Sequence, residues 1–445
     1  MKPATAPSAA RNGLTRGGAG RSFNQIPQGD GVPQNLLPMP PAGNSPAGPS
    51  LGRLLKLMGV LWLAGVAMRM TILAMPPVIP QVHSELHMSE TQVGLLIGLP
   101  LGMFAIAAVP GSLLIARVGV SLAVILGMVI TALAGAARAA AVDVWTLYAA
   151  AMATGFGVAI MQPGVPTLVR DWLPNRVVLG TIAYTSGMLM GATFAPVLTI
   201  PYVLPLVGGS WRLDLILWAV PAILIAPVFL LLSPTSNEHP AAQTAIGGRW
   251  WPDWKDPLVW LLGLAFGSNN SSYFATNAFL GDYLASEGKA DLLGPALGWL
   301  NGSQIVALIV LLLTADRLQR RAWPFLLFGP MLLAAFLGMI FIPSAVGIIV
   351  SAALVGFTTA VTFTATLALP PLLSAPGDLP RTAAGMFTIS YTCAIVIPTI
   401  SGALWDLTGR PWTAFVPLCI CAVTLTVLGV AVTRQRPARA NARAS

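Results

Sequence analysis

The sequence predicts an all-α membrane protein with twelve transmembrane helices arranged as two sets of six. Three observations lead to this fold class. The chain of 445 residues is 56% apolar and only 9% charged, whereas an ordinary soluble domain carries about 25% charged residues. From Leu57 onward, apolar runs of roughly 20 to 27 residues recur, each long enough to cross a bilayer. The loops are short except at residues 233–256, so this central cytoplasmic loop separates six runs from six.

The chain begins with a polar tail. Residues 1–56 are rich in Pro, Gly, Ala and Ser and poor in large apolar side chains. Such a segment cannot bury enough surface to offset its ordering entropy, so we expect a disordered cytoplasmic tail. No secretory signal is expected, because the first roughly 15 to 30 residues hold no apolar segment.

The expected helices follow in two six-helix bundles, residues 57–232 and 257–433, and a basic cytoplasmic tail, 434–445, ends the chain. The expected helix ranges are 57–82, 91–116, 119–138, 143–169, 176–203, 212–232, 257–284, 291–314, 322–342, 345–372, 380–404 and 410–433.

The basic residues predict the orientation. The chain has 24 Lys and Arg residues and a formal net charge of +9. With both termini inside, all but five of these residues fall in the tails or at cytoplasmic helix ends; the exceptions are Arg138, Arg212, Lys289 and Arg410, at external ends, and Arg69. Short basic loops are retained on the cytoplasmic side, so both termini are expected there. The charges form no basic face, so no nucleic acid partner is expected.

Arg69 is the candidate centre of a binding site. It lies about twelve residues into the first helix, or about 18 Å from its cytoplasmic end in a hydrocarbon core about 30 Å thick. An ionised side chain at that depth costs about 2.5 to 3.5 kcal/mol on insertion scales, so such residues usually face a water-filled cavity or a partner. No Asp or Glu is expected at comparable depth. A guanidinium offers a planar fork of donors that matches a small anion; the alternative is snorkelling or helix pairing.

A polar cluster occurs at matching depth in the seventh helix, the counterpart of the first. It contains Asn269, Asn270, Tyr273 and Asn277, and positions 270, 273 and 277 fall on one helix face. We expect these side chains to line the substrate path, although amides also commonly join membrane helices to one another. Gln162 and Tyr184, on the fourth and fifth helices, are further candidates.

Other chemistries find little support in the sequence. Cys393, Cys419 and Cys421 all fall in apolar runs and are expected to act as small hydrophobes. His83, His87 and Glu85 are too few and too close to solvent for a metal site. No phosphate-binding loop is found, no Asp, Glu or His is evident within the membrane away from helix ends, and the helices offer no catalytic constellation. We therefore expect no cofactor, no metal, no enzymatic activity and no direct proton coupling through a buried carboxylate.

The six-plus-six pattern resembles the major facilitator superfamily, whose halves are repeats that bind substrate between them near the midplane. The family carries an Asp-Arg loop after helix two and again after helix eight. The second copy is visible at Asp316 and Arg317, whereas the first keeps Arg117 but has Ala116 at the acidic position.

Longer stretches resemble the cyanate-transporter branch of that superfamily, which includes nitroimidazole exporters. They are Arg69 with Pro77-Val78-Ile79-Pro80, residues 155–192, residues 367–387 and residues 401–415. The resemblance covers most of residues 60–430. One departure is Met161-Gln162, where the branch usually has Gly-Asn.

The resemblance implies a secondary transporter in the inner membrane that moves a small anionic or polar organic solute by alternating access. The alternative is export of a neutral compound such as a nitro-aromatic. The expected partners are a small-molecule substrate and the lipid bilayer, and a monomer is expected to be functional. Pro76 and Pro77 are expected to be packing or hinge positions, which membrane helices tolerate.

Overall fold

A computed structural model describes residues 51–234, 251–318, 321–342, 344–374 and 378–435. The expected N-terminal tail lies outside these ranges up to residue 50, and the expected central loop and C-terminal tail lie mostly outside them. The described residues belong to one unit, Pro49–Ser445. All regular structure within them is helical.

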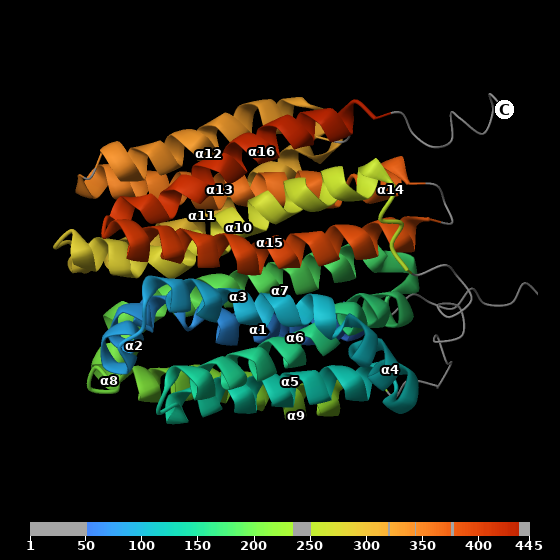
Figure 1. The fold of residues 1–445 in the computed structure, drawn as a ribbon. Coiled ribbons are helices and arrows are strands. Elements are labelled where there is room, and N and C mark those ends of the chain that lie inside the picture. Colours follow the sequence, from blue (N-terminus) through green and yellow to red (C-terminus); the bar gives the residue numbers. More distant parts are fainter. Residues whose placement is uncertain (1–50, 235–250, 319–320, 343, 375–377, 436–445) are drawn as a thin grey trace, which may run out of the picture. The chain divides into compact units, whose positions relative to one another are not determined.

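The first half of the fold comprises residues 51–232 and the second half residues 257–433 (Figure 1). The helices of the first half are α1 Leu51–Leu73, α2 Ile79–Leu86, α3 Glu90–Ile106, α4 Ala108–Val118, α5 Val120–Ala137, α6 Val144–Trp172, α7 Val177–Leu198, α8 Leu204–Leu206 and α9 Trp211–Leu232. Those of the second half are α10 Pro257–Ser286, α11 Leu293–Leu318, α12 Trp323–Phe341, α13 Ala345–Leu367, α14 Pro370–Leu373, α15 Leu379–Thr408 and α16 Val416–Thr433.

The two halves repeat one packing pattern. In the first half α1 packs on α7 and α9, α5 packs on α6 and α9, and α3 packs on α6. In the second half α10 packs on α15 and α16, α12 packs on α13 and α16, and α11 packs on α13. Each of these packing pairs in the first half has a counterpart in the second half. The first expected helix corresponds to the seventh, the second to the eighth, and so on to the sixth and twelfth. This equivalence supports two pseudo-symmetric bundles.

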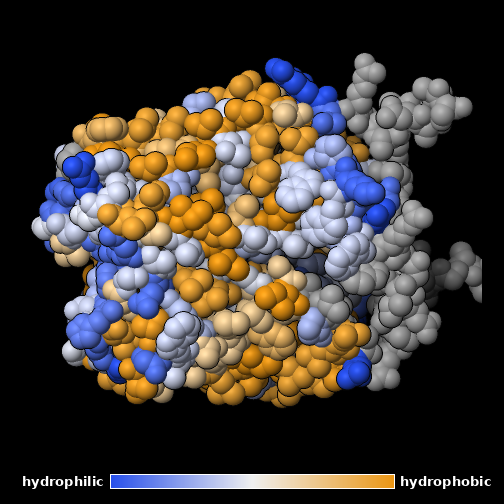
Figure 2. Space-filling model, viewed as in Figure 1, coloured by the Kyte–Doolittle hydropathy of each residue, from blue (hydrophilic) through white to orange (hydrophobic). Residues whose placement is uncertain are grey.

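Ten helical segments of the described chain are long and apolar enough to cross a membrane. The two expected helices outside this set are helical as well: residues 91–116 fold as α3 and α4, which meet at Ala107, and residues 257–284 fold as α10. Polar residues of α10 lower its hydropathy. A count of twelve crossings therefore stays a prediction. Figure 2 shows hydrophobic residues over most of the face drawn, with hydrophilic residues gathered toward two ends.

Several helices differ from their expected ranges for local reasons. Helix α1 begins at Leu51, earlier than position 57, and is followed by a 3-10 turn, Pro76–Val78, before α2. Pro76 has no N–H to continue the helix. Ser89 caps the start of α3. Its side chain accepts from the Gln92 N–H while the Gln92 side chain accepts from the Ser89 N–H; this capping box satisfies two backbone donors.

Small residues bring the two halves together along α3 and α15. Gly94, Gly98 and Gly102 lie four residues apart on α3, and each faces α15. A Cβ at Gly94 would collide with the Pro398 carbonyl, and one at Gly402 with the Glu90 carbonyl. Glycines at this spacing let membrane helices approach closely. The α3 and α15 backbones are thereby in direct contact across the halves.

Candidate functional site

Arg69 lies on α1 and is partly buried between the two halves. Its guanidinium carbon lies 5.6 Å from the centre of the Phe274 ring of α10, within the usual range of a cation–π interaction. The hydroxyls of Tyr273 and Tyr391 are within its electrostatic range. Among the described residues, no hydrogen bond or ion pair is formed by the Arg69 side chain. Its full set of donors is therefore open to a ligand.

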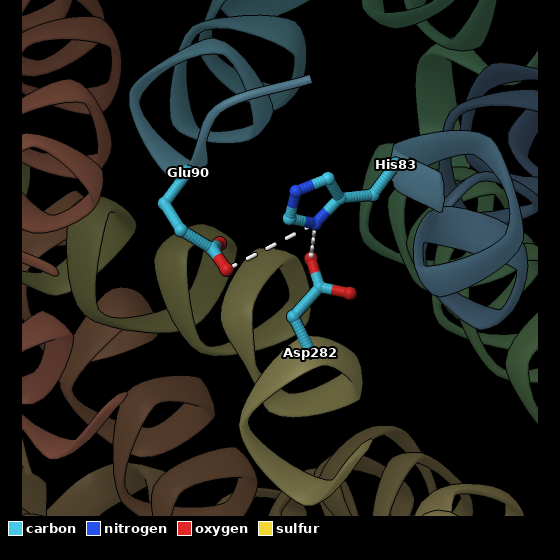
Figure 3. A group of neighbouring side chains, drawn as sticks. All are labelled: His83, Glu90 and Asp282. Carbon is cyan, nitrogen blue, oxygen red and sulfur yellow. Dashed lines mark hydrogen bonds and ion pairs between the residues drawn. The ribbon is translucent and has the colours of Figure 1, made fainter. Parts of the chain in front are cut away.

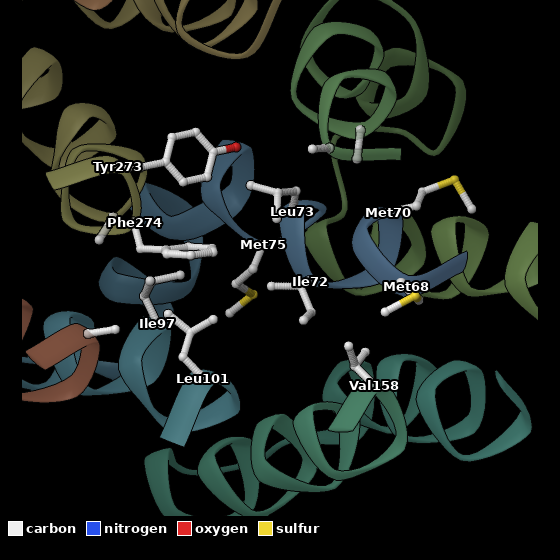
Figure 4. Packing of buried hydrophobic residues seen from close by; sticks show 14 of the residues in the cluster. Met68, Met70, Ile72, Leu73, Met75, Ile97, Leu101, Val158, Tyr273 and Phe274 are labelled. Carbon is white, nitrogen blue, oxygen red and sulfur yellow. The ribbon is translucent and has the colours of Figure 1, made fainter. Parts of the chain in front are cut away.

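Apolar side chains surround Phe274, the ring that Arg69 contacts. Figure 4 shows Met75 and Ile97 beside Phe274, with Leu73 and Ile72 of α1 near Met75. All five side chains are buried. Charge interactions strengthen where water is excluded. The site combines one cation with a hydrophobic and aromatic wall.

Asn269 and Asn270 are buried on α10 and bond to two other helices of the second half. Asn269 Oδ1 accepts a hydrogen bond from Thr362 Oγ1 of α13 at 2.6 Å, and Asn270 Nδ2 donates to Ser390 Oγ of α15 at 2.8 Å. Each amide keeps further donor or acceptor capacity beyond these bonds. The two neighbours thus tie α10 to α13 and α15.

Tyr273 and Asn277 meet α11 at Asn301. The Tyr273 hydroxyl donates to Asn301 Oδ1, and Asn301 Nδ2 donates to Asn277 Oδ1 at 3.1 Å. Gln304, one turn further along α11, lies beside the Tyr273 hydroxyl, and its buried amide nitrogen has no hydrogen-bond partner. The four residues expected on α10 thus lie close together. Their hydrogen bonds also join α10 to α11, α13 and α15.

Gln162 and Tyr184 lie on the first half. Gln162 Nε2 of α6 donates to the Tyr391 hydroxyl of α15 at 2.9 Å, a bond that crosses between the halves. The Tyr391 ring also meets Phe104 of α3 edge to face, with ring centres 5.1 Å apart. Tyr184 is partly buried on α7, and its backbone carbonyl lies against Gly65 of α1.

Pro76 and Pro77, the expected packing or hinge positions, are buried in the turn after α1, which packs against α10 and α11. Arg117 is exposed at the last turn of α4. Asp316 and Arg317 are in the last turns of α11, but their side chains lie outside the described part of the chain.

Arg138 lies at the end of α5, as expected, but its burial is not predicted from the sequence. Its side chain is buried, with only 2% of the residue exposed. Nη2 donates to the Thr71 carbonyl of α1 at 2.6 Å, and Nε donates to the Gly135 carbonyl at 3.3 Å. Asp214, fully buried at the start of α9, acts on it electrostatically. A terminal position in sequence therefore does not guarantee exposure once neighbouring helices cover it.

Several residues around Arg69 escape the sequence analysis: Phe274, Asn301, Gln304, Ser390 and Tyr391. Their only sequence signal is weak. Asn301 and Gln304 lie three positions apart in an otherwise apolar stretch, and Ser390 and Tyr391 are adjacent in another. Such isolated polar residues are common in membrane helices, so tertiary contacts alone single them out.

Curated proteins with similar sequences are transporters. The chain is 24% identical to an uncharacterized transporter of Bacillus subtilis, covering 84% of this chain and 92% of that protein. It is 24% identical to the 2-nitroimidazole transporter of Escherichia coli, over 87% of this chain and 97% of that protein. It is also 24% identical to the cyanate transport protein of Escherichia coli, over 84% of this chain and 97% of that protein. The resemblance to the cyanate and nitroimidazole branch is confirmed.

Solved structures share the fold at lower identity. A bacterial homologue of the human lysosomal transporter Spinster, in an inward-facing and unoccupied conformation, has a TM-score of 0.61 and 17% identity, with 87% of this chain and 95% of that chain covered. A mutant of the nucleoside transporter NupG has a TM-score of 0.65 and 15% identity, with 85% and 98% covered.

The family is shown by a direct match. Residues 61–344 match the model of the Major Facilitator Superfamily. That range spans most of the first half and about half of the second, and agrees with the all-helical fold and the transporter relatives. The chain is a multi-pass membrane transporter that belongs to the major facilitator superfamily.

Proposed function

We propose that the chain is a secondary transporter that moves a small anionic or polar organic solute across a bacterial inner membrane by alternating access. Arg69 holds the negative or electron-rich group of the solute between the two halves. Asn269, Asn270, Tyr273 and Asn277 contribute neutral hydrogen-bond partners from α10, and Gln162 and Tyr184 do so from the first half.

The observation that carries this proposal is the open guanidinium of Arg69. A cation kept away from bulk water without a counter-ion is costly. A bound carboxylate-like anion offsets that cost, because it can accept two parallel hydrogen bonds from the fork. The Gln304 amide beside the Tyr273 hydroxyl adds a polar group on the α11 side of the site. These features support a small planar anion more than a bulky or cationic solute.

A second candidate is export of a neutral nitro-aromatic compound. The apolar and aromatic wall around Arg69, with Phe274 at 5.6 Å, favours a flat aromatic ring. Nitro oxygens could accept from the same guanidinium. One of the similar proteins is a 2-nitroimidazole transporter, which supports inclusion of this class.

The arrangement of contacts between the halves supports alternating access. Bonds such as Thr91 N–H to Asp406 Oδ2, at 2.8 Å, join the halves where α3 begins and α15 ends. This end carries α2 and α8 in Figure 1 and is the one expected to face outside. In this state the outer ends are held together. Rocking of one bundle against the other, as in related transporter folds, would separate them.

The test is ligand-induced thermal stabilisation of the purified protein. A panel of small anions, including cyanate, and of nitroimidazoles is measured with wild type, Arg69→Ala and Arg69→Lys. Loss of one partner of a buried charge pair costs about 2 kcal/mol or more, or roughly 30-fold in Kd. We expect the ligand-induced shift to disappear in Arg69→Ala and to fall in Arg69→Lys, since Lys keeps the charge but lacks the fork. Equal shifts in all three proteins would reject Arg69 as a ligand contact.

Flux in proteoliposomes separates the two solute classes. Uptake of a free anion responds to an imposed membrane potential unless exchange is electroneutral, whereas net flux of a neutral nitro-aromatic does not. A potential-independent flux without any counter-solute would favour the exporter. Gln162→Asn, which restores the shorter amide usual in the relatives' branch, tests whether the side chain at this position sets solute size.

A further inference from the structure

The outer end of the fold holds a cluster of three potential metal ligands: His83 on α2, Glu90 at the start of α3 and Asp282 in the last turns of α10 (Figure 3). His83 Nδ1 lies 3.0 Å from Asp282 Oδ2 and 3.9 Å from Glu90 Oε1. One ligand atom from each residue lies within 4.8 Å of the others. Figure 3 shows the imidazole and both carboxylates converging from separate helices.

These spacings fit a tetrahedral transition-metal ion. Zn²⁺ binds nitrogen and carboxylate oxygen at about 2.0 to 2.2 Å, and a tetrahedron with such bonds has edges of roughly 3.3 Å. The distances of 3.0 and 3.9 Å lie on either side of that value. Small rotamer changes would suffice to bring three ligands onto one ion, and the fourth position stays open for water.

Glu90 supplies an independent sign of a missing ligand. Only 8% of the residue is exposed, and its Oε2 atom is buried without a hydrogen-bond partner. Its backbone N–H donates to Asp406 Oδ1 at 2.9 Å, which fixes the start of α3. An unpaired carboxylate oxygen in a buried site is costly, and a cation would satisfy it.

Charge and access also suit a divalent cation. Asp282 is 7% exposed, and a neutral imidazole with two carboxylates carries a charge that a divalent ion balances. The His83 side chain is 25% exposed, which gives an ion a path from solvent. Imidazole with carboxylate favours Zn²⁺ and similar ions over Mg²⁺ and Ca²⁺, which prefer all-oxygen sites.

We propose that His83, Glu90 and Asp282 form a Zn²⁺ site that clamps the outer ends of the two halves together. The ligands come from both halves, because α2 and α3 belong to the first and α10 to the second. Bound Zn²⁺ therefore stabilises the state in which these ends are closed, and external Zn²⁺ inhibits the transport cycle. The inhibition rests on the proposed alternating access, whereas the binding does not.

Zinc binding is tested by titration calorimetry on the purified full-length protein, and Co²⁺ absorption reports a tetrahedral site. The variants are His83→Asn, Glu90→Gln and Asp282→Asn, each checked for an unchanged thermal midpoint without metal. The control is His87→Asn, because His87 is exposed, lies four positions away and has a positive φ of 48°, which Asn tolerates.

We expect one Zn²⁺ per chain. Removing a residue that supports a metal ligand lowers metal affinity roughly 10- to 100-fold. Each ligand variant should lose more Zn²⁺ affinity than that, while the control should bind Zn²⁺ like wild type. No zinc binding by wild type, or binding that survives all three substitutions, overturns the site. Neither measurement needs a solute, so the metal site and the solute site at Arg69 are tested independently. Either proposal can be rejected while the other is supported.

The clamp is tested by distances between spin labels at Ser84→Cys and Ala285→Cys. Both positions are exposed near the site, one on each half; Cys393, Cys419 and Cys421 are first replaced by Ser. In the labelled protein, Zn²⁺ should shift the distribution of label-to-label distances toward shorter values. The same labelled protein carrying Glu90→Gln should show no such shift. If Zn²⁺ binds and leaves the distribution unchanged, the clamp is wrong.

Discussion

Two arginines of the first half, Arg69 and Arg138, differ in how their charges are satisfied. Arg138 is 2% exposed, bonds to the Thr71 and Gly135 carbonyls and is faced by Asp214. Arg69 is partly buried, rests on Phe274 and makes no hydrogen bond or ion pair within the part of the chain that the structure describes. Both are near the same stretch of α1, yet only one has protein partners.

The difference separates a structural arginine from the arginine that we propose binds the solute. Pro76 prevents α1 from continuing, and the Thr71 carbonyl, near that break, receives the Arg138 donor. Buried backbone groups are nearly always paired, so Arg138 completes the hydrogen bonding of the fold. Arg69 makes no such bond among the residues that the structure describes. This contrast supports the proposal that its charge binds the solute.

The largest effect on folding is expected from Arg138→Met. The substitution removes the donors of two buried carbonyls, Thr71 and Gly135, and takes a cation out of the electrostatic range of Asp214. A buried acceptor left without its donor costs about 1 to 3 kcal/mol, and two are affected. The measurement is the free energy of unfolding in mixed micelles.

The control for that prediction is Arg138→Met combined with Asp214→Leu. Asp214→Leu removes the carboxylate that acts on Arg138 electrostatically, so the double variant should recover the electrostatic part of the loss but not the part due to the two carbonyls. Unchanged stability of Arg138→Met alone would show that its hydrogen bonds contribute nothing, and Arg138 could no longer serve as the structural member of the comparison.

A smaller loss is expected from Tyr273→Phe. The phenol donates to buried Asn301, and an unsatisfied buried acceptor costs about 1 to 3 kcal/mol. Tyr184→Phe is the matched control, because the Tyr184 hydroxyl has no hydrogen-bond partner among the described residues; its unfolding free energy should not change. If Tyr184→Phe is the more destabilising of the two, the hydrogen-bond network around Asn301 is not what holds α10 against α11.

The smallest loss is expected from Gln162→Leu, which removes the bond to Tyr391. Hydrogen bonds between membrane helices contribute about 0.6 kcal/mol on average. Tyr391→Phe deletes the same bond, so the double variant should be no less stable than the worse single variant. Fully additive losses in this cycle would mean that the two side chains do not interact.

The sequence predicts the helices well because apolar length is a local property. The apolar runs are visible in order along the chain, but the expected range 57–82 runs through the break between the end of α1 and the 3-10 turn at Pro76. The division of residues 91–116 at Ala107 is not predicted, although a local signal exists. Pro110 has no N–H to donate to the Ile106 carbonyl, and its ring clashes with that carbonyl.

The site is predicted only in part, because contacts between helices are not a local property of the sequence. Arg69 stands out because its charge contradicts its apolar surroundings. Arg138 does not stand out, because its burial depends on α1 and α9. His83 and Asp282 are 199 positions apart in the chain, so no spacing rule joins them. Residues that lie near each other only after folding have no signature in one sequence.

Arg69→Met sharpens the comparison most, because it repeats the Arg138→Met substitution at the other arginine. Met is apolar and flexible enough to fill the space of the Arg stem. The free energy of unfolding without ligand should stay the same or rise, since an unpaired charge is removed and no hydrogen bond within the described residues is lost. The stabilisation by any true substrate should disappear at the same time. A loss of stability near that of Arg138→Met would instead mean that Arg69 supports the fold. The guanidinium would then belong to the helix packing, and the solute would have to be held elsewhere between the halves.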